Sequence, residues 1–172
     1  GPAYLPYCLP GLLYITMPML MMMDLRDAGK LNSSLEKHDQ AGLLYPSAII
    51  FSIWINDTMA YIVGSLIGKT PFSKISPKKT WEGTSGGIFF SVIILTFVGK
   101  FLLLTLVDSA IIAAIAAIVG TFGDLLESKL KRLAGVKDSG SLMPGHGGFL
   151  DRFDSLLLAT PFVWLYIQLF MR

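Results

Sequence analysis

Long apolar runs alternate with shorter polar segments along this chain. A helix that crosses a bilayer needs about 20 mostly apolar residues, and a helix satisfies its own backbone hydrogen bonds in lipid. The pattern therefore predicts five transmembrane helices, at residues 4–23, 42–67, 86–106, 110–126 and 153–171. The expected fold class is an all-α, polytopic integral membrane protein.

The composition supports a membrane protein. Hydrophobic residues make up 53% of the chain and charged residues only 15%, compared with about 25% charged residues in soluble domains. The mean hydropathy is +0.61. The aromatic and aliphatic content excludes a disordered chain. Cys8 is the only cysteine, which excludes an intrachain disulfide and a thiolate metal site.

We divide the chain into an N-terminal segment, residues 1–41, and a membrane region, residues 42–172, that carries the candidate chemistry. Residues 24–40 mix acidic and basic side chains and are expected to form a solvated loop. No basic leader precedes the first apolar run, so we do not expect a signal peptide. Because the chain opens Gly-Pro without an initiator Met, we expect a fragment whose longer form has further N-terminal helices.

Two polar segments carry most of the positive charge. Residues 68–83 and 127–152 together hold nine Lys and Arg, whereas the segments on the opposite side hold three, or four with Lys100. Two predicted helices separate these segments, so both lie on one face, and the positive-inside rule places that face in the cytoplasm. We expect a multi-pass protein of the bacterial cell membrane with a polar site facing the cytoplasm.

Residues 128–154 contain five basic residues, three acids, one histidine and five glycines in 27 positions. Asp124 and Ser128 are spaced i, i+4 and share a helix face, and Asp151 and Asp154, spaced i, i+3, share another. Hard divalent cations take oxygen ligands, and zinc ligands are lacking nearby. The spacing predicts an Mg²⁺ site at Asp124, Asp151 and Asp154, with helix capping and salt bridges as the alternative.

Basic residues and glycines in this stretch suggest anion binding. Charge alone does not separate attraction to anionic lipid headgroups from neutralisation of a substrate phosphate. Residues 144–148, Pro-Gly-His-Gly-Gly, cannot form a regular helix. Their backbone amides, followed by a helix N-terminus, would suit an anion. His146 would contact phosphate, metal or base, or be a hydrogen-bonded loop residue. The basic residues are Lys129, Lys131, Arg132 and Lys137.

Asp57 lies near the middle of the second predicted helix. An ionisable side chain at membrane depth is costly, so it is by default a candidate functional residue. The alternative is a hydrogen bond to a neighbouring helix.

Residues 128–154 as a whole resemble the signature of the phosphatidate cytidylyltransferases, also called CDP-diacylglycerol synthases. The resemblance covers roughly residues 45–172. Two departures are Met59, where family members often have Gly, and the greater length of the family at the N-terminus. The matching segments are SKLKR (128–132), KDSG (137–140), LMPGHGGFLDRFD (142–154), SPKKTWEG (76–83) and NDT (56–58).

The resemblance implies a cytidylyl transfer in which a phosphate oxygen of phosphatidic acid attacks the α-phosphorus of CTP and pyrophosphate leaves. It implies Mg²⁺, with a second cation as an option, CTP, phosphatidic acid and the bilayer as partners, a homodimer as an option, and no nucleic acid. Ser128 would be a binding hydroxyl or metal ligand, not a nucleophile. The implied catalytic residues are Asp124, Ser128, Lys131, Arg132, Asp151 and Asp154. The implied substrate-binding residues are Asp57, Lys78, Lys79, Glu82, Lys137, Asp138, His146, Gly147, Gly148 and Arg152.

Other functions fit parts of the pattern. A CTP-dependent polyprenol or phytol kinase would transfer the γ-phosphoryl group instead, but the long signature favours the cytidylyltransferase. A CDP-alcohol phosphotransferase lacks support because its motif is absent. A cation transporter would explain the buried acids but not the glycine-rich loop. A lipid-binding scaffold would need only the basic loops.

Overall fold

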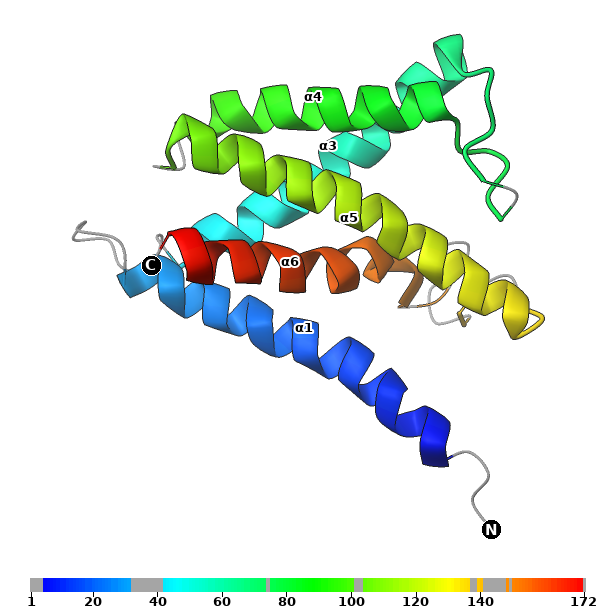
Figure 1. Ribbon diagram of the computed structural model, residues 1–172, viewed down its shortest axis with the longest axis horizontal. Coiled ribbons are helices and arrows are strands. Elements are labelled where there is room, and N and C mark those ends of the chain that lie inside the picture. Colours follow the sequence, from blue (N-terminus) through cyan, green and yellow to red (C-terminus); the bar gives the residue numbers. More distant parts are fainter. Residues whose placement is uncertain are drawn as a thin grey trace.

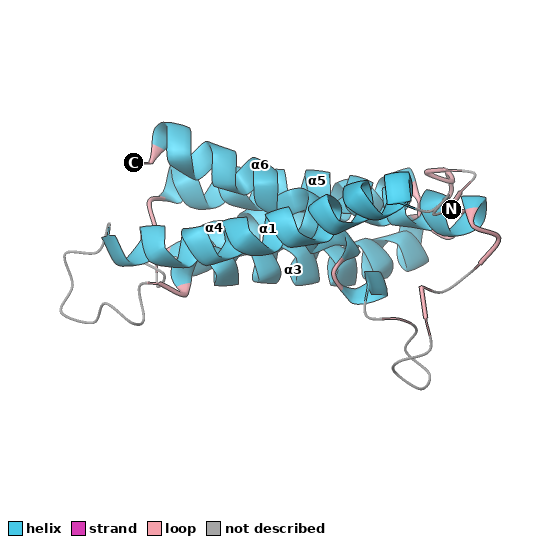
Figure 2. Cartoon of the chain, turned by 90° about the horizontal axis from the view of Figure 1, so that it is seen from below, coloured by secondary structure: helices cyan, strands magenta, loops and turns pink. Residues whose placement is uncertain are grey.

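The computed structural model describes residues 5–31, 42–73, 75–100, 104–136, 139–140, 148 and 150–171. Over these residues the regular elements are all helices, and the only pairing of extended residues is an isolated bridge between Pro71 and Thr80, which confirms the all-α prediction. The helices run from one end of the molecule toward the other, and α3 crosses α5 obliquely (Figures 1 and 2). The elements are α1 (Leu5–Leu31), α3 (Leu44–Ile67), α4 (Trp81–Gly99), α5 (Leu106–Leu133), the 3-10 turn η1 (Leu150–Arg152) and α6 (Asp154–Phe170).

Three helices among the described residues, α3, α4 and α5, are long and apolar enough to cross a membrane. The apolar helix α6 is shorter, with 17 residues. These helices make the chain a polytopic membrane protein. The crossing of the bilayer by α1 and α6 stays a prediction.

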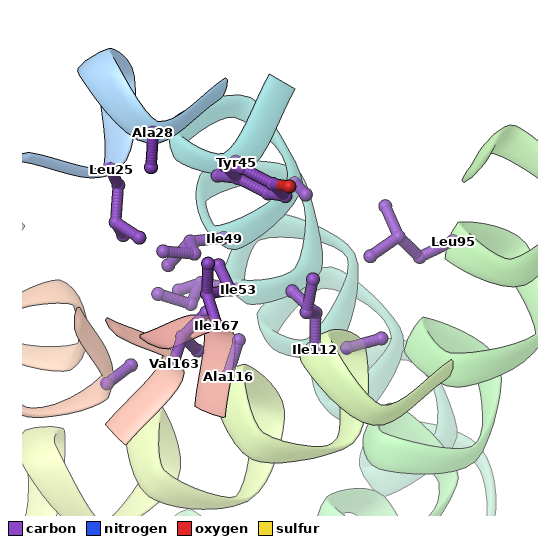
Figure 3. Close-up of a cluster of buried hydrophobic side chains, with 13 residues drawn as sticks. Leu25, Ala28, Tyr45, Ile49, Ile53, Leu95, Ile112, Ala116, Val163 and Ile167 are labelled. Atoms are coloured by element: carbon purple, nitrogen blue, oxygen red, sulfur yellow. The ribbon is translucent and has the colours of Figure 1, made fainter. Parts of the chain in front are cut away.

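One apolar core joins all the helices that the structure describes (Figure 3). Tyr45 and Ile49 of α3, Ile112 of α5 and Ile167 of α6 are buried together in it. The centre of α5 is rich in alanine and glycine, and small residues let neighbouring helix backbones approach closely. This close packing of α5 against α3, α4 and α6 fixes the position of the polar residues at its C-terminal end.

The prediction of a solvated loop from residue 24 is wrong for residues 24–31, which continue α1. Leu25 and Ala28 are fully buried in the core. Asp24 Oδ2 accepts hydrogen bonds of 2.6 Å from Trp164 Nε1 and of 2.6 Å from Gln168 Nε2, both on α6. The prediction failed because the charged residues of this segment alternate with a few apolar ones, and those apolar residues form a face that packs against the last helix.

Other helix boundaries also differ from the prediction. The third helix begins at Trp81 instead of residue 86, because the Thr80 hydroxyl accepts a 3.1 Å hydrogen bond from the Gly83 amide and caps the first turn. This helix ends at Gly99 instead of residue 106, so Lys100 lies directly after it. The fourth helix continues to Leu133 instead of ending near residue 126. The first basic residues of the polar stretch are therefore helical, and their side chains have fixed directions.

Gly123 of α5 determines how closely this helix approaches the start of α6. A Cβ atom at residue 123 would lie 2.7 Å from the backbone oxygen of Asp154, whereas at Gly120 the nearest neighbours would be 3.4 Å away. We expect Gly123→Ala to lower the Tm of the detergent-solubilised protein, because overpacking costs about 1–3 kcal/mol. Gly120→Ala, the matched control, should leave the Tm unchanged or raise it slightly. Equal Tm values for both variants would contradict this packing.

Candidate functional site

The candidate residues gather at one end of the bundle, where α5 ends, α6 begins and the loop after α3 returns to α4 (Figure 1). Lys79 of that loop forms an ion pair with Asp124 of α5. This contact places the loop 68–83 against α5, whose last two turns begin the segment 127–152.

The loop between α3 and α4 is held in place by its own backbone and by Glu82. The carboxylate of Glu82 accepts hydrogen bonds of 3.2 Å from the amides of Lys69 and Thr70. The Trp81 amide donates a 3.0 Å hydrogen bond to the Thr70 carbonyl. The carboxylate of Glu82 thus holds the loop that carries Lys78 and Lys79, and its binding of substrate stays a prediction.

A polar pocket of about 360 Å³ lies between α3, this loop and α5. Asn56 orients two of its neighbours, since its Nδ2 atom lies 3.4 Å from Asp57 Oδ1 and 3.3 Å from Thr121 Oγ1. The remaining walls carry hydroxyl and ammonium groups. The residues that define the polar pocket are Asn56, Asp57, Ser76, Lys78, Lys79 and Asp124.

A second pocket of about 500 Å³ opens between α3 and the start of α6. One end is charged and the other is apolar, so we call it the amphiphilic pocket. Asp57 lines both pockets and therefore stands where they adjoin. The residues that define the amphiphilic pocket are Ile53, Trp54, Asp57, Asp151, Arg152 and Asp154.

Asp124 and Ser128 share a face of α5, as their spacing predicted. The Ser128 hydroxyl donates a 3.4 Å hydrogen bond to Asp124 Oδ1. Asp154, the first residue of α6, interacts with the carboxyl groups of both Asp124 and Glu127. The contact of α5 with α6 thus brings three carboxyl groups near one another, of which Asp124 lines the polar pocket and Asp154 the amphiphilic pocket.

Asp151 uses both of its oxygens within the protein. Oδ1 accepts a 2.6 Å hydrogen bond from Lys131 Nζ, and Oδ2 accepts bonds of 2.9 Å and 2.7 Å from the amides of Ser139 and Gly148. Partial burial acts to raise the pKa of Asp151, but these donors outweigh it and hold the pKa well below its usual range. Asp151 is therefore ionised, and its hydrogen bonds join α5 to the segment that follows this helix.

Glu127 is a site residue that the sequence analysis missed. Its side chain is only 2% exposed, and Lys131 Nζ lies 3.4 Å from its Oε1 atom. Neither carboxylate oxygen has a hydrogen-bond partner among the described residues. A buried carboxylate without such partners is costly unless a cation compensates it. The i+3 spacing from Asp124 and the i+4 spacing to Lys131 were the available signals.

The three predicted metal ligands do not form a preassembled cluster. Among the described residues no group of three or more His, Cys, Asp or Glu side chains is placed to hold a metal ion. Asp151 is engaged by Lys131 and two amides, whereas Asp124 and Asp154 remain adjacent. The metal site stays a prediction.

Several other predicted residues have definite places, and some lie outside the described residues. Arg152 lines the amphiphilic pocket, and Gly148 donates its amide to Asp151. Lys131 bridges Asp151 and Glu127, while Arg132 lies exposed one residue later on α5. The predicted residues outside the described ranges are Lys137, Asp138, His146 and Gly147.

Comparison with known proteins identifies the family. The model of the cytidylyltransferase family matches residues 4–170. The phosphatidate cytidylyltransferase of Bacillus subtilis (strain 168) is 42% identical over 135 residues, which are 77% of this chain and 50% of the relative. That of Staphylococcus haemolyticus is 46% identical over 125 residues, 70% of this chain and 47% of the relative.

A cyanobacterial relative gives the same result. The phosphatidate cytidylyltransferase of Synechocystis is 42% identical over 132 residues, 76% of this chain and 45% of the relative. The chain thus spans about half the length of the curated relatives that it matches. Since the family model covers nearly the whole sequence, this chain belongs to the cytidylyltransferase family.

Proposed function

We propose that this protein transfers the cytidylyl group of CTP to phosphatidic acid, forming CDP-diacylglycerol and pyrophosphate. The observation that carries the proposal is the pair of pockets, one polar and one amphiphilic, that adjoin at Asp57 beside the carboxyl groups of α5 and α6. Such a pair suits a reaction between a water-soluble molecule and a lipid. The relatives named phosphatidate cytidylyltransferase support the same reaction.

In this reaction a phosphate oxygen of phosphatidic acid forms a bond to the α-phosphorus of CTP. The bond between the α-phosphorus and the oxygen that bridges to the β-phosphorus breaks, and that oxygen leaves with pyrophosphate. No covalent intermediate with the protein is needed, so the protein contributes positioning and charge neutralisation. Lys78, Lys79 and Arg152 supply positive charge to the two pockets.

The donor set at the junction of the pockets suits Mg²⁺. Mg²⁺ prefers oxygen ligands and is usually held by one or two carboxylates together with substrate phosphates. Asp124 and Asp154 are adjacent carboxyl groups, and the nearby buried carboxylate of Glu127 adds negative charge. We assign Asp124 and Asp154 as the residues that would hold the ion. When bound, Mg²⁺ would neutralise phosphate charge and stabilise the leaving group.

The site would face the cytoplasm, where CTP is present. The basic segments 68–83 and 127–152 support this orientation through the positive-inside rule. A homodimer stays a prediction.

Two labels on CTP test the proposed function with purified protein in detergent micelles containing phosphatidic acid. We expect label on the α-phosphate to enter the lipid fraction and label on the γ-phosphate to be released as pyrophosphate. Chelation of divalent cations should stop the transfer, and added Mg²⁺ should restore it. Label from the γ-phosphate in a lipid alcohol, with the α-label left in CDP, would instead identify a lipid kinase.

A further inference from the structure

We infer that Tyr14 of α1 is a positioning residue of the site, whose phenolic hydroxyl donates a hydrogen bond, directly or through water, to the carboxylate of Glu127. The two pockets are lined by α3, α5, the loop after α3 and the start of α6. This inference adds α1, which lines neither pocket. It rests on the proposed function only where it concerns turnover.

Helix α1 turns one face toward the rest of the protein. Pro18, Leu25 and Ala28 are buried on that face. Tyr14 precedes Pro18 by four residues and Leu25 by eleven, so its side chain leaves the helix on the same face. The ring of Tyr14 is partly buried and its hydroxyl oxygen is fully buried. The hydroxyl group therefore points into the protein.

The register of α1 against α6 places Tyr14 level with the start of α6. The two helices lie side by side and run in the same direction (Figure 1), and Asp24 of α1 is hydrogen-bonded to Trp164 of α6. Tyr14 and Asp154 each precede their partner in that hydrogen bond by ten residues, or about 15 Å along the helix axis. The inward hydroxyl thus reaches the end of the bundle where the carboxyl groups gather.

The polar atoms buried at this place complement one another. Within the part of the chain that the structure describes, neither the Tyr14 hydroxyl nor either carboxylate oxygen of Glu127 has a hydrogen-bond partner. The hydroxyl group interacts electrostatically with Glu127 and with Asp154. Buried polar groups in folded proteins are nearly always hydrogen-bonded. A phenolic hydroxyl is a donor, and an ionised carboxylate is an acceptor only.

A hydrogen bond from Tyr14 would fix the direction of the Glu127 carboxylate. Lys131 Nζ lies 3.4 Å from Oε1 of Glu127, which leaves Oε2 for Tyr14. Glu127 in turn interacts with the carboxyl group of Asp154, one of the two residues assigned to hold the cation. Tyr14 would therefore act on the reaction through Glu127 and Asp154, without touching either substrate.

Tyr14→Phe tests this role, because it removes the hydroxyl group and keeps the ring. We expect kcat to fall about tenfold, the effect of one hydrogen bond to a charged group. The KM values for CTP and phosphatidic acid should change less than about twofold, since Tyr14 lines neither pocket. If Tyr14 served only to pack α1 against its neighbours, Tyr14→Phe would leave kcat unchanged.

Tyr45→Phe is the matched control. Tyr45 is also largely buried, with 5% of its surface exposed, but it lies in the apolar core (Figure 3). It is about 18 Å along the axis of α3 from Asp57. Its substitution should leave kcat and both KM values unchanged.

Thermal unfolding without substrate tests the hydrogen bond itself. Tyr14→Phe should lower the Tm of the detergent-solubilised protein by about 3–6 °C. In a Glu127→Met background the same substitution should shift the Tm by less than about 1 °C, because the acceptor is already gone. Should Glu127→Met not fold, Glu127→Gln replaces it, and there the shift should fall by about half, since a neutral acceptor forms a weaker bond.

The two measurements separate this inference from the proposed function. If the unmodified protein transfers no label from the α-phosphate to lipid, the proposed function fails, and the Tm values still decide whether Tyr14 is bonded to Glu127. Equal Tm shifts with and without the Glu127 carboxylate would overturn the inference. So would normal turnover of Tyr14→Phe in a protein that catalyses the reaction.

Discussion

Asp124→Asn is expected to lower the rate of cytidylyl transfer by a factor of about 10² to 10³. Asp124 borders the polar pocket, pairs with Lys79 and interacts with Asp154. Asparagine keeps the size of the side chain but removes the charge that would hold the cation, and loss of such electrostatic stabilisation commonly costs a factor of about 10² to 10³ or more. The measurement is the initial rate at which label from the α-phosphate of CTP enters lipid.

Asp108→Asn is the matched control for this variant. Asp108 lies on the same helix but in its first turn, where it accepts hydrogen bonds of 2.5 Å from the Thr105 hydroxyl and 2.8 Å from the Tyr166 hydroxyl. Asp108→Asn should lower the Tm but keep turnover within about threefold of the unmodified protein. An Asp124→Asn protein that retains more than a tenth of normal turnover would show that the site has been assigned wrongly.

Lys131→Met is expected to destabilise the protein by about 3 kcal/mol or more. Lys131 Nζ lies between Asp151 Oδ1, at 2.6 Å, and Glu127 Oε1, at 3.4 Å, and all three side chains are largely buried. Removal of one partner from a buried ion pair leaves uncompensated charge, which typically costs about 3–5 kcal/mol. Thermal unfolding of the detergent-solubilised protein, followed by loss of helical circular dichroism, measures the effect.

Two further variants make this prediction specific. Lys129→Met removes a lysine of the same helix that is exposed, and it should change the Tm very little. Adding Glu127→Gln to Lys131→Met should recover part of the lost stability. Of the two carboxylates that lose their cation, Glu127 and Asp151, only Asp151 then remains charged. If the single substitutions at residues 129 and 131 had equal effects, the ion pairs around Lys131 would carry no net stabilisation.

Local patterns in the sequence were sufficient for the helices and for one part of the site. Apolar runs long enough to span a bilayer located α3 to α6 to within a few residues at most ends. The i, i+4 spacing of Asp124 and Ser128 correctly placed both on one face, since that geometry depends only on the helix.

Contacts between distant segments could not be read from such patterns. The ion pair of Lys79 with Asp124 depends on how α3, α4 and α5 pack. The role of Asp151 depends on backbone amides at residues 139 and 148, which any residue type except proline supplies, so side-chain identity gave no signal. Residues 24–31 looked like a loop because their charges outnumber the few apolar residues that pack against α6.

The hydrogen bonds that Asp151 accepts have a consequence for the entropy of the chain. One carboxylate oxygen accepts the amides of Ser139 and Gly148, so the two ends of the intervening residues 140–147 are already joined in the folded protein. The entropic cost of bringing the ends of a loop together grows with the length of the loop. In this protein the cost of closing the loop between residues 139 and 148 is part of the free energy of folding, so a ligand that binds near Asp151 does not add it to its binding free energy.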